Sequence, residues 1–181
     1  ALTAAETGHL VISTLHTNNS VDTVGRIIDI FPGHQQQQIK IQLSSTLQGV
    51  FSQLLIPHKK RDRGLVLATE VLLVTNAIRN LIREGKIHMI RSAIEMGNEH
   101  GMQTMEQSLK KLYDEGKISI EEALGHAFDL ESMNQLLGIN KKASNSESRE
   151  PGQPKAAEHH KPTAGAGVSA AGSSPFKRMS L

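Results

Sequence analysis

Residues 7–18 read Thr7-Gly8-His9-Leu10-Val11-Ile12-Ser13-Thr14-Leu15-His16-Thr17-Asn18, and this stretch decides the fold that we expect. Its aliphatic run, residues 10–15, has the length and composition of one buried strand. His9 precedes the run and His16 follows it, so a titratable side chain stands just past the carboxyl end of the strand. In open α/β sheets ligands bind at that end, because the connecting loops diverge there and leave a crevice. The stretch therefore predicts an α/β fold with a ligand site near His16.

Two interpretations of these histidines remain open. Seven residues of extended strand span about 23 Å, so we expect no metal ion to be shared by His9 and His16. A single neutral imidazole can instead donate one N–H to a phosphate oxygen while a carbonyl holds its other nitrogen. The alternative is purely structural, with each histidine closing one end of the strand.

Composition limits the classes of function that the chain can have. The 181 residues are enough for one domain and a tail. No cysteine is present, which excludes disulfides and thiolate metal sites. Aromatic residues make up 3% of the chain, which argues against stacking platforms for single-stranded nucleic acid. No apolar run approaches the roughly 20 residues of a membrane span, so we expect no transmembrane segment.

The net charge of +2 is distributed unevenly. Residues 140–181 hold seven Lys or Arg and three Glu, whereas the preceding residues hold 13 basic and 15 acidic side chains. The compact part therefore carries no single-sign field, and we expect no nucleic-acid partner. The last 42 residues are rich in Ser, Ala, Gly, Pro and Lys, which predicts a disordered tail over 140–181.

Residues 1–74 read as one part of the chain. After the strand, Asn19 or Ser20 can cap a helix that stops at Pro32-Gly33, and a second helix begins near Gln35. Two β-type runs, 50–56 and 65–73, predict a hairpin. Its tip carries a basic cluster, residues 59–63, which is either a solubilising loop or a contact for phosphate or lipid headgroups.

Residues 75–139 read as a chain of four or five short helices that need one another for stability. Thr75 or Asn76 caps the first, over 77–84, and Gly85 ends it. Further on, Thr104 with Gln107 and Ser119 with Glu122 have the spacing of capping boxes. The sequence thus divides into 1–74, 75–139 and the tail.

The first of these helices, Ala77-Ile78-Arg79-Asn80-Leu81-Ile82-Arg83-Glu84, has two different faces. Ile78, Leu81 and Ile82 face inward, while Arg79, Asn80, Arg83 and Glu84 form a polar face. Two arginines four residues apart on that face repel each other slightly. The helix is therefore either a plain solvated one or one that faces an acidic surface or partner.

Several of these stretches together resemble the secretion and type IV pilus motor ATPases. Residues 7–18, with the helix-like residues 1–6 before them, are similar to the histidine box of that family. Residues 77–84 are similar to the signature helix of its pilus-retraction branch. The runs 26–32, 47–55 and 101–105 follow in the same order, and the resemblance covers about residues 1–137.

The resemblance implies the C-terminal half of a RecA-like P-loop NTPase domain, followed by a small helical subdomain. It implies a homo-hexameric cytoplasmic motor that binds ATP and Mg²⁺ between subunits. Such a motor works at the inner face of the inner membrane, on a pilus platform protein. His16 would then approach the γ-phosphate and His9 would support it. The helix over 77–84 would couple hydrolysis to retraction.

One part of the family pattern is missing from the chain. No phosphate loop of the form G-x-x-x-x-G-K-[ST] occurs, and the Mg²⁺-binding acids of the family are absent. Because these groups supply most of the stabilisation in phosphoryl transfer, we expect the chain alone to bind no cofactor and to hydrolyse no ATP. A chain that opens at Ala1 inside a helix indicates a C-terminal fragment. The alternative is a truncated, non-catalytic paralogue that docks on full-length subunits.

Overall fold

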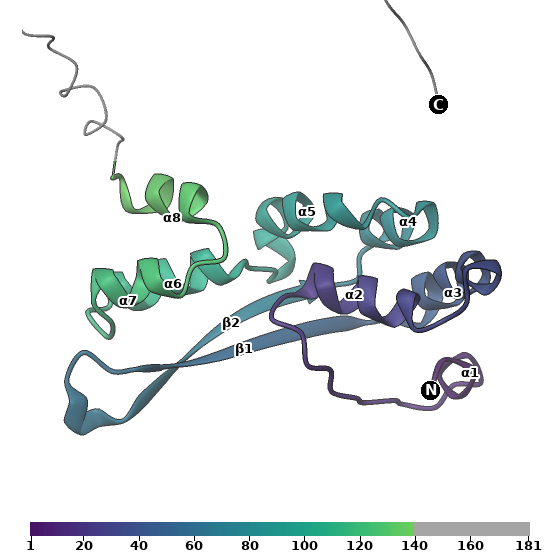
Figure 1. The fold of residues 1–181 in the computed structure, drawn as a ribbon, viewed down its shortest axis with the longest axis horizontal. Helices are drawn as coiled ribbons and strands as arrows, with labels where there is room; N and C mark the ends of the chain where they lie inside the picture. Colours follow the sequence, from purple (N-terminus) through teal and green to yellow (C-terminus); the bar gives the residue numbers. More distant parts are fainter. Residues whose placement is uncertain (140–181) are drawn as a thin grey trace, which may run out of the picture. The chain divides into compact units, whose positions relative to one another are not determined.

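A computed structural model of the chain describes residues 1–139, which belong to one compact unit. The expected disorder of 140–181 lies outside the described residues. No helix among residues 1–139 is long and apolar enough to cross a membrane. The elements run in the order α1 Leu2–Glu6, α2 Ser20–Asp29, α3 Gly33–Thr46, β1 Gly49–Pro57, η1 Arg61–Arg63, β2 Leu65–Leu73, α4 Asn76–Glu84, η2 Ile87–Met89, α5 Ile90–Met96, η3 Asn98–His100, α6 Met105–Asp114, α7 Ile120–Gly125 and α8 Leu130–Leu137 (Figure 1).

The prediction of a strand over residues 10–15 is wrong for residues 1–139 taken by themselves, although the mixed α/β class is confirmed. These residues form irregular chain, and the side chains of Leu10 and Ile12 are 88% and 85% exposed. A strand requires neighbours that exchange backbone hydrogen bonds with it. In the described part of the chain the strands β1 and β2 pair with each other. The aliphatic run therefore has no strand to pair with in residues 1–139.

The predicted hairpin is confirmed. Strands β1 and β2 are antiparallel, in a register that runs from Gly49 opposite Leu73 to Pro57 opposite Leu65. Alternate side chains point to opposite faces, and one face is covered by α2 and α6 (Figure 1). At the tip, η1 forms a short turn, and the backbone N–H of Lys59 donates to the carbonyl of Lys117.

Two apolar clusters hold the described residues together. The first joins α2, α3, α4 and α5 with the end of β2, through Val24, Ile28, Ile39, Leu43, Leu72, Ile78, Ile82, Ile90 and Ile94 among others. The second lies where α6 covers the other half of the hairpin and α7 and α8 pack on α6, around Ile56, Ala68, Met105, Leu109 and Met133. The first cluster contains residues from both sides of residue 74, and the division at this point stays a prediction.

The helix ends follow from local capping. Asn19 accepts from the backbone N–H of Asp22 at the start of α2, and Gly85 ends α4 in the left-handed conformation, at φ +73°. Thr104 and Gln107 form the expected capping box. Ser119 accepts from the N–H of Glu122, but the Glu122 carboxylate lies 3.3 Å from His126 Nε2. The second capping box is therefore only half formed, because the Glu122 side chain pairs with His126, the C-cap residue of α7.

Candidate functional site

The chain between His16 and α2, residues 16–19, is called the histidine segment below. His16 and His9 are both exposed, and His9 Nδ1 lies 3.0 Å from Thr7 Oγ1. Thr17 Oγ1 lies 2.6 Å from Thr23 Oγ1. Because Thr23 Oγ1 donates to the carbonyl of Asn19 at 2.8 Å, the hydroxyl of Thr17 is the donor to Thr23. The segment is thus tied to the first turns of α2.

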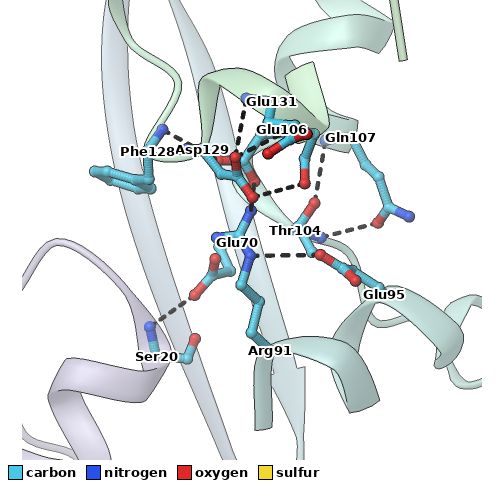
Figure 2. Close-up of polar contacts among 11 residues, drawn as sticks. Ser20, Glu70, Arg91, Glu95, Thr104, Glu106, Gln107, Phe128, Asp129 and Glu131 are labelled. Carbon is cyan, nitrogen blue, oxygen red and sulfur yellow. Dashed lines mark hydrogen bonds and ion pairs between the residues drawn. The ribbon is translucent and has the colours of Figure 1, made fainter. Parts of the chain in front are cut away.

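The start of α2 is in turn fixed to the sheet by Glu70. The backbone N–H of Ser20, the first residue of α2, donates to Glu70 Oε1 at 2.7 Å (Figure 2). Ser20 is fully buried and Glu70 is 2% exposed. A carboxylate is well placed here, because the N-terminus of a helix carries unpaired N–H groups and a partial positive charge. Glu70 therefore holds the start of α2, where the histidine segment ends, against β2.

A small cavity of about 290 Å³ adjoins this contact. Side chains of both charges line it, so it presents no single-sign surface to a ligand. No group of three or more His, Asp or Glu side chains within residues 1–139 could hold a metal ion. The lining residues are Asn19, Val21, Asp22, Glu70, His88, Arg91 and Ile94.

Arg91 joins this region to a second buried carboxylate, Glu106. Its Nη2 lies 2.9 Å from Glu106 Oε2 and 3.6 Å from Asp129 Oδ2 (Figure 2). The other Glu106 oxygen accepts from the backbone N–H groups of Phe128 and Asp129, at 3.1 and 3.0 Å. Glu106 is fully buried. Because both of its oxygens are engaged in holding α5, α6 and the start of α8 together, its role is structural.

Asp129 caps α8 and has a lowered pKa. The hydroxyl of Ser132 donates to its carboxylate at 2.7 Å, and the backbone N–H groups of Ser132 and Glu131 donate to the other oxygen. These hydrogen bonds, with a smaller contribution from the Arg91 charge, hold the pKa of Asp129 below its ordinary value of 3.8. Asp129 is therefore ionised at neutral pH.

The helix α4 has the two faces that its sequence predicts, with one correction. Ile78 and Ile82 are fully buried and Leu81 is half-buried, whereas Ala77, Asn80, Arg83 and Glu84 are exposed. The correction concerns Arg79, which was expected on the exposed face. It is half-buried, and its Nη1 donates to the carbonyls of Ser44 and Ser45 at 2.8 and 3.0 Å.

The physical reason for this correction lies at the end of α3. The last carbonyls of a helix have no partner within the helix and carry partial negative charge. Arg79 satisfies two of them, while Arg83 donates to its own neighbour Asn80. The two arginines therefore have different partners, and the open polar surface consists of Asn80, Arg83 and Glu84. These three residues are called the outer face of α4 below.

Charge on the outer face extends to Lys86. The ammonium group of Lys86 lies 2.8 Å from the Glu84 carboxylate, and this hydrogen bond lowers the pKa of Glu84 and raises that of Lys86.

At the other end of α4, an open cavity of about 510 Å³ is lined by Val74, Thr75, Asn76, Ala77, Arg79 and His100.

Three residues of these networks were not singled out from the sequence: Glu70, Arg91 and Glu106. For Glu70 a signal exists, because it is the one charged residue in the run 65–73, which apart from Thr69 is otherwise apolar. A charge inside a buried strand must have a partner, and that partner belongs to another element. Arg91 and Glu106 carry no such signal, since both lie at ordinary positions of amphipathic helices.

The chain is similar in sequence to a known protein family and to relatives of known function. A family model described as "Type II/IV secretion system protein" matches residues 1–125. The type IV pilus retraction ATPase PilT of Pseudomonas aeruginosa is 50% identical over 123 residues, which are 68% of this chain and 35% of the relative. A twitching motility protein of Neisseria gonorrhoeae is 48% identical over 134 residues, 74% of this chain and 35% of the relative. The chain thus spans about a third of the length of these relatives.

Solved structures give the same result. The crystal structure of the pilus retraction motor PilT with bound ADP is similar with a TM-score of 0.67 and 48% identity, over 74% of this chain and 37% of that one. The ATPase DotB of Legionella pneumophila is similar with a TM-score of 0.57 and 29% identity, over 67% of this chain and 32% of that one.

Proposed function

Because the chain belongs to the type II/IV secretion system protein family, we propose that it forms the C-terminal part of a homo-hexameric motor ATPase that powers type IV pilus retraction. The observation that carries this proposal is the likeness, in sequence and in fold, to the pilus retraction motor whose structure contains ADP. The family model matches residues 1–125, a range that contains α4.

The proposal includes a RecA-like fold for the complete ATPase domain. In that domain residues 10–15 form a strand, as their composition predicts. The exposure of Leu10 and Ile12 supports this, since apolar side chains gain free energy when a neighbouring strand and its covering helices remove them from water. In this proposal the partner strands come from outside residues 1–139.

We place ATP and Mg²⁺ between neighbouring subunits, with His16 directed at the γ-phosphate. His16 fits this role because its imidazole is exposed, on a segment that Thr17 and Ser20 hold to α2 and β2. His9 supports the same region from the other end of the strand. The bound nucleotide supplies the phosphoryl group, while His16 donates an N–H to it and reports whether it is present.

The outer face of α4 serves a different purpose in this proposal. It couples hydrolysis to retraction by contacting an inner-membrane platform protein, which places the motor at the cytoplasmic face of that membrane. Support comes from its composition: Asn80, Arg83 and Glu84 are open to solvent, while Ile78 and Ile82 fix the helix to the core.

The test is a chimera in which residues 1–139 replace the matching region of the Pseudomonas aeruginosa retraction ATPase. It is expressed in a strain that lacks its own retraction ATPase. We expect the chimera to hydrolyse ATP and to restore twitching, and we expect the isolated chain to release no phosphate, because it has no phosphate loop. In the chimera, His16→Ala should lower turnover by roughly tenfold or more, as loss of a group that touches the transferred phosphoryl does.

Other outcomes would contradict the proposal. An assembled chimera that hydrolyses ATP without restoring twitching would indicate a different motor of the same family. An isolated chain that co-purifies with full-length hexamers and changes their turnover would favour the alternative, a truncated, non-catalytic paralogue that docks on full-length subunits.

A further inference from the structure

Glu70 is a buried carboxylate that has no role in the function proposed above. We propose that Glu70 is a positioning residue, which holds the histidine segment on β2 in the geometry that ATP hydrolysis needs. This inference rests on the proposed function, because it acts through His16.

The first argument is the continuity of the contacts. Glu70 Oε1 accepts from the N–H of Ser20 at 2.7 Å, and Ser20 follows His16 by four residues. Four residues of fully extended chain reach about 14 Å at most. The bond between Thr17 and Thr23 shortens this reach further, because it draws the segment against α2. The location of His16 therefore depends on where Glu70 places the start of α2.

The second argument is that stability alone would favour an apolar side chain at position 70. The neighbours of Glu70 on the same face of β2, Ala68 and Leu72, are apolar and fully buried. A buried carboxylate is costly unless it accepts hydrogen bonds, and an apolar side chain would suit the core better. The carboxylate gives in return a charge-assisted hydrogen bond that is short and directional, at the positive end of α2. Such a bond fixes a position rather than adding much stability.

Glu106 supplies a matched control. It is also a buried glutamate, and it also accepts backbone N–H groups near the start of a helix, those of Phe128 and Asp129. It has no contact with the histidine segment. Glu106→Ala removes two backbone hydrogen bonds and the ion pair with Arg91, whereas Glu70→Ala removes the hydrogen bond to Ser20. A merely structural role therefore predicts that Glu106→Ala is at least as damaging as Glu70→Ala.

The experiment uses the chimera described above, with Glu70→Ala, Glu70→Gln and Glu106→Ala. Amide exchange over residues 14–22 should rise roughly tenfold in Glu70→Ala, since a local hydrogen bond is lost. The kcat for ATP should fall by roughly tenfold or more, as misplacement of a reacting group by about 1 Å does, while KM changes little. Glu70→Gln keeps an acceptor oxygen and should recover part of the loss. Glu106→Ala should lower Tm but leave kcat within about twofold.

A double variant shows whether Glu70 acts through His16. If it does, His16→Ala with Glu70→Ala should be no slower than His16→Ala alone. Multiplying effects would overturn the inference, and so would an equal loss of kcat in Glu106→Ala, or an unchanged kcat in Glu70→Ala. If Glu70→Ala does not fold, the same comparisons with Glu70→Gln decide. If His16→Ala alone leaves turnover unchanged, the proposed role of His16 fails, and amide exchange over 14–22 then decides whether Glu70 holds the segment.

Discussion

Asp129 illustrates how a single side chain combines a cap with a charge. Its carboxylate accepts from Ser132 and from two backbone N–H groups, and these bonds lower its pKa in the folded chain. In the unfolded chain the pKa returns to its ordinary value near 3.8. A group whose pKa is lower in the folded state stabilises that state above the unfolded pKa, and this contribution disappears as pH falls through the folded pKa.

We therefore expect Asp129→Asn to lower the free energy of unfolding at pH 7 by about 0.5 kcal/mol, a small value because the side chain is well exposed to screening solvent. Asparagine is itself a good cap, so the substitution mainly removes the charge. The difference from the parent chain should begin to shrink near pH 3.8 and disappear once the pH is below the lowered pKa that Asp129 has in the folded chain. Urea unfolding at several pH values measures it. A difference that persists at low pH would mean that the charge of Asp129 is not what stabilises α8, and Asp129→Ala, which removes the cap as well, serves as the reference.

At the scale of elements, α3 and α4 depend on each other through Arg79. The guanidinium satisfies the carbonyls of Ser44 and Ser45, and it comes from the next α-helix along the chain, beyond the hairpin. Charge-assisted hydrogen bonds to helix-end carbonyls contribute about 1–2 kcal/mol. We expect Arg79→Ala to cost about that much in the free energy of unfolding, and Arg83→Ala, on the open surface, less than about 0.5 kcal/mol.

Urea unfolding of the two variants, side by side, tests this difference. Both substitutions remove the same charge and the same number of atoms, so Arg83→Ala is a control for net charge and helix propensity. Equal midpoints for the two variants would show that Arg79 does not hold the end of α3.

How much of each element the sequence could predict depends on where its stabilising groups come from. Asn19, Thr75 and Gly85 act within their own turn, so the ends of α2 and α4 can be predicted from a few neighbouring residues. The hairpin follows because two complementary runs lie close together in the chain. Residues 10–15 have the right composition for a strand, but a strand also needs partners, and none is available in residues 1–139.

The candidate site shows the same division. The location of residues 77–84 on an amphipathic helix could be predicted, because helical periodicity is local. The true surroundings of Arg79 and Glu70 could not, since their partners lie 34–35 and 50 residues away in the sequence. Only the folded chain brings such partners together.

At the scale of the whole described region, one apolar cluster supports both of the proposed functional parts, the histidine segment and the outer face of α4. Val24 and Ile28 on α2, which carries the histidine segment, share this cluster with Ile78 and Ile82 on α4. The outer face of α4 is turned away from the cluster. Side chains on the outer face can therefore be exchanged without opening a cavity or disturbing the histidine segment.

The most direct test of the account is twitching by the chimera with Asn80→Ala and Arg83→Ala, measured beside its ATP turnover and its assembly. Lys111→Ala, which removes an exposed charge on α6, is the matched control and should twitch normally. We predict that the double variant assembles as hexamers and hydrolyses ATP within about twofold of the parent, because neither side chain is buried. Twitching should nevertheless be lost. Normal twitching, or a loss that is accompanied by failed assembly or failed turnover, would contradict the claim that the outer face of α4 couples hydrolysis to retraction.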